Sequence, residues 1–473
     1  MTDDNPWVME VGFIRMVREL PFYGMSPETL IAAFADDPDA SFMRLASHDE
    51  TSTPMLDVLG VMAYERCRFS GAENPFSAVR DRLVKRAAPL DPALPAFQGG
   101  ALGSFSYECV RHVEPSLARS GTMAHPGVDA DVTFHRAYVV IDHRAQRAYV
   151  IAGYFPNEES RQDGERSAKV ALDTVFARLL SAQARPAVTR GEVTPLPLEA
   201  FEADLGYDRF VEGVRALKEH IRAGDIFQAV LSDRFVLRRE YAPLALFSAL
   251  LAGSPSPYQF YVPTTEGILV GSSPEMLVRA QDGELETHPI AGTRPRGPDA
   301  ADAKRMKRQL SRSAKENAEH IMLVDLARND LGRVSLPGSV EVKDFRDLKV
   351  YPELFHLVSV VVSELDPSRH PLDALAACFP AGTLSGAPKV RAMRLLAELE
   401  QTRRGVYGGV VTMAGYDGTL ESCIAIRCAR VAADHVVLQA GAGIVADSSP
   451  DKEYREVEHK TRALRRALAR LET

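Results

Sequence analysis

Two neighbouring stretches near the end of the chain, "RGVYGGVVTMAGYDGTLESCIAIRCARV" (404–431) and "HVVLQAGAGIVADSS" (435–449), predict consecutive β-strands. Short apolar runs separated by glycine-containing turns are typical of strands that lie in one sheet. The residues that follow, 450–472, predict a helix, because Ser449 can cap its first turn and Pro450 suits the first helical position.

Strand and helix patterns continue upstream of these stretches. Apolar residues at helical spacing predict helices over 207–224 and 314–334. Strand patterns occupy 225–237 and 258–273. This part of the chain therefore combines both kinds of element.

Changes in composition suggest how the chain is organised. Residues 183–204 contain several prolines and few aromatic residues, which predicts a connector. It separates an N-terminal region, 1–182, from a motif-rich region, 205–473, that we expect to be catalytic. Within the first region, 137–155 predict a hairpin, and the glycine-rich stretch 97–108 indicates a bulged or closely packed strand.

Charge and cysteine content exclude several classes of protein. The chain of 473 residues has a net charge of −8 and no basic arm, which argues against nucleic acid as a partner. It has no run of 18 apolar residues and a polar, acidic start, so we expect neither a membrane span nor a signal peptide. Its five cysteines are far apart and form no CxxC pair, which fits a reducing cytoplasm.

Two pairs of carboxylates have the same helical spacing. Glu316 and Glu319 lie three residues apart, and Glu453 and Glu456 repeat that spacing on the last helix. Oxygen ligands without neighbouring thiols suit Mg²⁺, which uses one or two direct carboxylates and keeps several waters. On spacing alone, however, such pairs are more often solvated helix faces than metal sites.

Three glycine-rich loops offer backbone N–H groups to an anion. They are Gly292–Gly297, "GTLSGAPK" (382–389) and "GAG" (441–443). The second is not a Walker A motif, and the third lies too far before the next helix for a dinucleotide-binding turn. Together with Arg427, which lies within a predicted strand, the three loops favour a small polyanionic ligand.

Taken in order, the motifs of 205–470 resemble those of the chorismate-utilising enzymes, above all component I of anthranilate synthase. The resemblance implies an α/β fold of the α+β type. In that fold two large, mainly antiparallel sheets form a sandwich with helices outside, and the active site lies in the cleft between halves. The motifs are "AGDIFQAVLSDRF", "GSSPE", "PIAGTRPRG", "AEHIMLVDLARNDLGRV", "HLVS", "GTLSGAPKVRAM", "YGG…IAIR", "QAGAGIV" and "EYREVEHK".

The resemblance also implies a Mg²⁺ site built from the carboxylate pairs. Glu319 and Glu456 match the direct ligands, and Glu316 and Glu453 match residues that hold coordinated waters. The metal would bind the ring carboxylate of chorismate.

Further positions match substrate-binding and catalytic residues of the family. Glu275 matches the general acid that helps the C4 hydroxyl leave, and His356 matches a histidine associated with pyruvate elimination. We also expect Thr293 and Gln228 to be catalytic residues. The residues expected to bind substrate are Gly292, Thr293, Thr383, Gly386, Tyr407, Arg427, Gly441, Gly443 and Lys460.

Two positions distinguish the reactions within this family. Water-adding relatives carry a lysine base where this chain has Gln228, and an amide cannot activate water in that way. The 4-amino branch carries a nucleophilic lysine where this chain has Ala291. We therefore expect ammonia to attack C2 directly and to give 2-amino-2-deoxyisochorismate, followed by pyruvate elimination to anthranilate.

We expect a separate glutamine amidotransferase subunit to supply the ammonia, because no such segment follows residue 473. One alternative is a secondary-metabolite enzyme that stops before pyruvate elimination. Another is a catalytically silent subunit that activates a glutaminase. Tryptophan-regulated relatives carry "LLES" where this chain has "RLAS" (44–47) and often a methionine where it has Gln259, so we expect weak tryptophan feedback.

Overall fold

The structure is a computed structural model that describes residues 12–21, 24–49, 51–124, 126–182, 193–295, 300–350 and 354–472. Its N-terminal strands are β1 (Ile14–Leu20), β2 (Ser41–Ala46), β3 (Pro54–Ser70), β4 (Gly100–Phe105), β5 (Val128–Asp142) and β6 (Arg147–Tyr154). The hairpin predicted for 137–155 is confirmed, because β5 pairs antiparallel with β6 around a short turn. The helices of this region are α1 (Pro27–Ala32), α2 (Pro75–Lys85), α3 (Val110–Val113) and α4 (Arg161–Ser181), with 3₁₀ turns η1 (Tyr107–Cys109), η2 (Pro115–Leu117), η3 (Gly121–Ala124) and η4 (Leu198–Ala200).

Strands form within each of the four stretches that were predicted to contain them: 225–237, 258–273, 404–431 and 435–449. The later strands are β7 (Glu202–Ala203), β8 (Gln228–Leu237), β9 (Tyr258–Thr264), β10 (Gly267–Ser273), β11 (Arg279–Gln281), β12 (Glu284–Thr287), β13 (Ile290–Pro295), β14 (Glu341–Val350), β15 (Leu354–Glu364), β16 (Gly386–Ala387), β17 (Val410–Gly415), β18 (Leu420–Ile424), β19 (Cys428–Val431) and β20 (Val436–Ile444). The helices are α5 (Gly206–Arg222), α6 (Pro243–Gly253), α7 (Ala300–Arg312), α8 (Ala314–Gly332), α9 (Pro371–Cys378), α10 (Lys389–Leu399) and α11 (Pro450–Arg470), with the 3₁₀ turn η5 (Gly382–Leu384).

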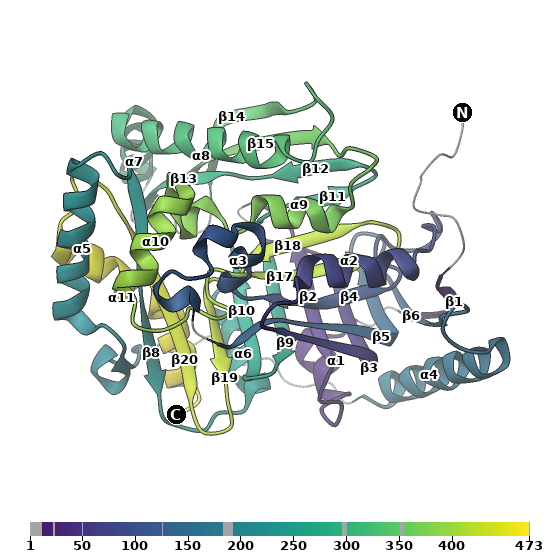
Figure 1. The fold of residues 1–473 in the computed structure, drawn as a ribbon. Helices are drawn as coiled ribbons and strands as arrows, with labels where there is room; N and C mark the ends of the chain where they lie inside the picture. Colours follow the sequence, from purple (N-terminus) through teal and green to yellow (C-terminus); the bar gives the residue numbers. More distant parts are fainter. Residues whose placement is uncertain are drawn as a thin grey trace.

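Antiparallel pairing joins the two parts of the chain into one curled sheet. β2 pairs with β9 and β4 pairs with β17, so N-terminal strands lie beside strands of the motif-rich region. Helices such as α5, α4 and α8 lie around the outside of the strands (Figure 1). The expected mixed fold of antiparallel strands and outer helices is confirmed. The proposed boundary at 183–204 stays a prediction, because 183–192 lie outside the described residues.

The glycine-rich stretch 97–108 forms the closely packed strand that its sequence indicates. β4 lies between β5 and β17. A Cβ atom on Gly100 would lie 2.0 Å from the carbonyl oxygen of Ala414, and one on Gly103 would lie 2.3 Å from that of Asp131. Glycine is therefore required for the neighbouring strands to approach this closely.

Apolar faces fix the outer helices against the sheet. Phe210, Val214 and Leu217 of α5 are buried in the same core cluster as Leu231 of β8. Burial of each such side chain contributes about 1.5–3 kcal/mol. The predicted start of the last helix is confirmed at Ser449, although its side chain makes no capping hydrogen bond.

Within the described ranges, no helix has the length and apolar character that crossing a membrane requires.

Candidate active site

The side-chain amide of Gln228 lies between the start of α8 and the end of β20. Gln228, at the start of β8, donates from Nε2 to Glu319 Oε1 at 3.1 Å. A Cβ atom on Gly443 would lie 3.0 Å from the same Nε2 atom. Glu319, Gln228 and Gly443, which come from three separate motifs, therefore lie together.

Lys460 connects the last helix to the same strand. Its ammonium group lies 2.7 Å from Glu456 Oε1, one helical turn earlier. It also donates to the carbonyl oxygen of Gly441 at 2.7 Å. The backbone carbonyl of Lys460 accepts a 3.3 Å hydrogen bond from Arg427 Nη1. One helix thus brings a carboxylate, a cation and the guanidinium of Arg427 to the glycine end of β20.

Arg427 has an unusual backbone and a partly buried side chain. Its φ is 51°, a left-handed conformation that costs a non-glycine residue free energy and is common at functional sites. Burial lowers the pKa of Arg427, and the charges of Tyr407, Glu456 and Glu275 oppose that shift. The expectation that Arg427 lies within a strand is wrong. Arg427 lies in the short segment between the end of β18 at Ile424 and the start of β19 at Cys428, where its left-handed backbone belongs to neither strand.

Glu275 is a partly buried acid with a hydroxyl partner. Thr383 Oγ1 in η5 donates to Glu275 Oε1 at 2.7 Å. Burial raises the pKa of Glu275 to about 7, against the opposing effects of the Thr383 hydrogen bond and the charges of Lys460 and Arg427. A carboxyl group that is protonated close to neutral pH can donate a proton to a leaving hydroxyl.

His356 of β15 faces the loop that begins at β13. Its Nδ1 lies 3.2 Å from the carbonyl oxygen of Gly292. Burial, with the charge of Arg427, lowers the pKa of His356, so its ring is neutral near pH 7. A carbonyl oxygen only accepts hydrogen bonds, so Nδ1 carries the proton and Nε2 is the basic nitrogen of the ring.

Gly292 also approaches the carboxylate of Glu316. Its φ is 67°, and a Cβ atom there would lie 3.0 Å from Glu316 Oε2. The backbone is irregular at this point, since the register of β13 against β15 shifts between Ala291 and Thr293. The Thr293 backbone lies opposite His356. The side chains of Ala291 and Thr293, like all of 296–299, lie outside what the structure describes.

The remaining predicted residues take these positions. A Cβ atom on Gly386 would lie 2.2 Å from the carbonyl oxygen of Gln228, so glycine there lets β16 pair closely with β8. Tyr407 is buried, and burial raises the pKa of its phenol. Glu453 lies on the first turn of α11.

The surroundings of Glu319 and Glu456 decide whether they fit a magnesium site. Among the described side chains, no three His, Cys, Asp or Glu residues already form a metal-binding cluster. Glu319 and Glu456 are instead held by the amide of Gln228 and the ammonium of Lys460. Among the described residues, the buried Oε1 atom of Gln228 has no hydrogen-bond partner, and a water on a metal ion held by Glu319 would supply one. Oxygen ligands of this kind fit Mg²⁺ with retained waters.

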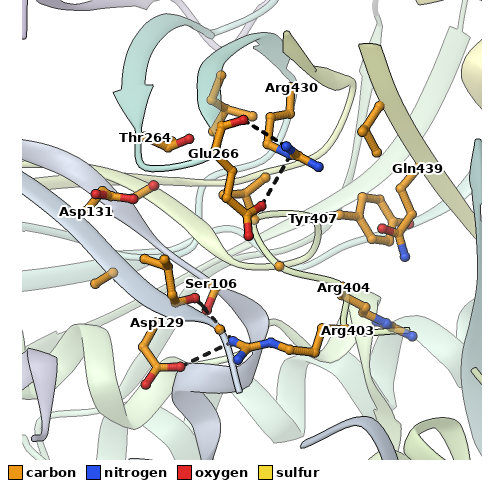
Figure 2. A pocket seen from close by; sticks show the side chains of 18 of the residues that line it. Ser106, Asp129, Asp131, Thr264, Glu266, Arg403, Arg404, Tyr407, Arg430 and Gln439 are labelled. Carbon is orange, nitrogen blue, oxygen red and sulfur yellow. Dashed lines mark hydrogen bonds and ion pairs between the residues drawn. The ribbon is translucent and has the colours of Figure 1, made fainter. Parts of the chain in front are cut away.

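An ionic network behind Tyr407 was missed by sequence reasoning. Figure 2 shows Arg403, Arg404 and Tyr407 along a cavity of about 110 Å³. A smaller cavity, of about 50 Å³, is lined by Glu275 and Thr383. The smaller cavity is the better candidate for the chemistry, because it holds Glu275. The arginines of the larger one are already in ion pairs: Arg403 with Asp129, Arg430 with Glu266, Arg234 with Asp204 and Arg404 with Glu400. The doubled arginine of "QTRRGVYGG" (401–409) is the signal that could have revealed this network.

Comparisons with known proteins agree on the kind of protein this chain resembles. The sequence signature of the family described as "chorismate binding enzyme" matches residues 42–466. Anthranilate synthase component 1 of Streptomyces coelicolor is 41% identical over 460 residues, covering 93% of this chain and 88% of that protein.

Solved structures share the fold. Anthranilate synthase component I of Streptococcus pneumoniae superposes with a TM-score of 0.75 at 30% identity, covering 87% of this chain and 92% of that one. The menaquinone-specific isochorismate synthase of Escherichia coli gives a TM-score of 0.74 at 19% identity, covering 98% and 97%, and so shows the fold alone.

Proposed function

This chain belongs to the chorismate-binding enzyme family and is a chorismate-utilising enzyme of the anthranilate synthase component I type, and we propose that it aminates chorismate at C2 with ammonia and then eliminates pyruvate to give anthranilate. The observation that carries the proposal is the partly buried Glu275, held by Thr383 near the cations Lys460 and Arg427. It supplies an acid beside groups suited to a substrate with two carboxylates.

In the first step, Glu275 acts as the general acid. Its proton passes to the C4 hydroxyl, the C4–O bond breaks, and water leaves as ammonia forms the new C2–N bond. Both double bonds of the ring shift, from C1–C2 and C5–C6 to C1–C6 and C4–C5, and the added nitrogen loses one proton. A pKa of about 7 keeps much of Glu275 protonated at neutral pH.

Gln228 supports ammonia rather than water as the nucleophile. Its amide is bonded to Glu319 and has no basic lone pair with which to deprotonate water. Ammonia is nucleophilic without such a base. The alanine at position 291 offers no amine for a covalent step, which favours direct attack at C2.

Two groups of residues would hold the anionic ends of chorismate. Arg427, with Tyr407 and the backbone N–H groups of Gly441 and Gly443, would bind the enolpyruvyl carboxylate, for which a guanidinium gives paired hydrogen bonds. Lys460 adds a positive charge beside them. Gly292, Thr293, Thr383 and Gly386 would surround the other end, which carries the ring carboxylate.

Mg²⁺ is proposed at the carboxylate pairs, with Glu319 and Glu456 as direct ligands and Glu316 and Glu453 acting through waters. When bound, the ion would neutralise the ring carboxylate of the substrate. On binding the ion, Glu319 would exchange its contact with the Gln228 amide, and Glu456 its contact with the Lys460 ammonium, for contacts with the metal.

The second step falls to His356. With Nδ1 donating to Gly292, its Nε2 can take the C2 proton of the aminated intermediate. The C3–O bond then breaks, the ring becomes aromatic, and the released enolpyruvate takes a proton on its methylene carbon to become pyruvate.

Product identification tests the proposal. Protein, chorismate, an ammonium salt and MgCl₂ are incubated, and products are followed by anthranilate fluorescence and mass spectrometry. Anthranilate and pyruvate in equal amounts are expected, with activity lost in Glu275→Gln. Accumulation of the aminated intermediate alone would replace the proposal with an enzyme that stops after the first step, and no turnover would favour the silent subunit.

A glutamine amidotransferase is proposed as the source of ammonia, in line with the name "component 1" of the relatives. Addition of such a subunit with glutamine should replace the ammonium salt. If turnover occurs only with free ammonium, this part of the proposal fails.

A further inference from the structure

Arg404 is a buried guanidinium that touches three parts of the candidate site. Its side chain is 1% exposed. Nη1 donates to the carbonyl oxygen of Leu384 at 2.6 Å, and Nη2 donates to that of Val230 at 2.7 Å. Leu384 follows Thr383 in η5, and Val230 is two residues beyond Gln228 on β8. One side chain thus fixes η5 relative to β8.

Glu400 neutralises and orients this guanidinium. Arg404 Nε lies 2.8 Å from Glu400 Oε2, and Nη2 lies 2.6 Å from Glu400 Oε1. Glu400 also accepts from the backbone N–H and the hydroxyl of Ser232 on β8. A paired fork of this kind has a fixed plane, which lysine cannot reproduce.

The same guanidinium lies between two aromatic rings. Its central carbon is 4.3 Å from the ring centroid of Tyr107 and 5.9 Å from that of Tyr407. The N-terminal region holds the backbone beside it, because Glu108 accepts from the N–H groups of Arg404 and Gly405 at 2.7 and 3.1 Å. The segment that leads to Tyr407 is therefore held by Glu108 through its backbone and by Leu384 and Val230 through the Arg404 side chain.

We propose that Arg404 is a positioning residue of this enzyme, which sets the Thr383 hydroxyl on Glu275 and the Tyr407 ring beside Arg427 through its bonds to Leu384 and Val230. The inference rests on the proposed function, since turnover is one of its readouts. It does not require Arg404 to touch the substrate. A displacement of about 1 Å in a catalytic group can cost about 10²-fold in rate, which sets the scale of the expected effect.

Arg404→Lys tests the proposal, and Arg86→Lys is the matched control. Arg86 is 3% exposed, forms a fork on Glu158 at 2.8 and 2.9 Å, and stacks on Phe134 at 4.6 Å. Both variants should lower the melting temperature. Only Arg404→Lys should reduce kcat/KM, by about 10- to 100-fold.

The pH profile separates positioning from mere stability. The Thr383 hydrogen bond lowers the pKa of Glu275, so its loss raises that pKa. The alkaline limb of kcat/KM should therefore move to higher pH in Arg404→Lys, as in Thr383→Val. The double variant should move it no further than Thr383→Val alone. If the alkaline limb of kcat/KM lies at the same pH in Arg404→Lys as in the parent, the proposal is overturned, whatever the activity.

A second measurement does not depend on turnover. Hydrogen exchange over residues 382–386 should be faster in Arg404→Lys than in the parent or in Arg86→Lys. If the parent has no activity, the proposed function fails and this exchange alone decides the role of Arg404; equal exchange would reject it. If Arg404→Lys does not fold, Glu400→Gln, which removes one acceptor of the fork, should cause the same changes at smaller size.

Discussion

Thr383 Oγ1 donates a 2.7 Å hydrogen bond to Glu275 Oε1, across 108 residues of sequence. Glu275 lies between β10 and β11, and Thr383 lies in η5, so the two meet only because η5 folds back onto the strands. Burial alone would push the pKa of Glu275 upward, and this bond with the nearby cations limits the shift to about 7. The pair therefore sets the pH range in which the acid can act.

The rate should depend on the protonation of Glu275. A general acid works in its protonated form, so kcat/KM expressed per concentration of free NH₃ should be highest below pH 7 and fall as the pH rises through about 7. Thr383→Val removes a bond that lowers this pKa and should move the fall to higher pH. Initial rates between pH 5.5 and 9 would show it, and a shift to lower pH would contradict the assignment.

The same residue should make stability depend on pH. Its folded pKa of about 7 lies above the ordinary value of 4.5, so ionisation disfavours the folded state as the pH rises from 4.5 through 7. The full cost above pH 7 is about 3 kcal/mol. Glu275→Gln should thus raise the free energy of unfolding at pH 8 by up to that amount and change it little at pH 4.5. Urea unfolding at both pH values measures the difference; equal effects would contradict the raised pKa.

Glu319→Gln and Glu456→Gln should each weaken the proposed magnesium site. Loss of one carboxylate removes a charge and a direct ligand, so we expect turnover to fall at least about 10-fold and the Mg²⁺ needed for half-maximal rate to rise. Glu458→Gln is the control, because Glu458 lies on the same helix but pairs with Arg465 at 3.7 Å. Turnover that survives in both ligand variants would overturn the metal assignment.

His356→Gln should separate the two chemical steps. Glutamine can still donate to the Gly292 carbonyl, but it has no basic nitrogen to take the C2 proton. Amination should continue while anthranilate formation falls about 10²- to 10⁴-fold. Mass spectrometry should then show the aminated intermediate; anthranilate formed at the parent rate would exclude His356 as the base.

Tryptophan should bind weakly. Ala46 ends β2, and its backbone N–H donates to the Pro257 carbonyl at 2.7 Å. Because the residue is alanine, the position that carries an acid in regulated relatives offers only a methyl group. Gln259 of β9, which pairs with Arg44 of β2, is 5% exposed. Isothermal titration should detect no binding at micromolar tryptophan, whereas chorismate with MgCl₂ in the same sample should give heat. Micromolar affinity for tryptophan would refute the expectation.

Local patterns explain why the elements were predictable. The helices expected over 207–224 and 314–334 form as α5 and α8, because apolar residues at helical spacing bury one face. The glycines of 97–108 were informative because close strand packing excludes a Cβ atom. Arg427 was misplaced, since a left-handed residue between two strands leaves no trace in the alternation of side chains.

The sequence by itself determined the inventory of this protein: strands and helices of a mixed fold, two carboxylate pairs, three glycine-rich loops, and motifs that identify the family. These follow from local spacing and residue type. Only the tertiary structure decided which of them meet. It joined Gln228 to Glu319, Lys460 to Gly441 and Thr383 to Glu275. It also buried Arg404 between η5, β8 and Tyr407. Burial and contact between distant segments set the pKa of Glu275 and the role of Arg404, and neither is a property of a stretch of sequence.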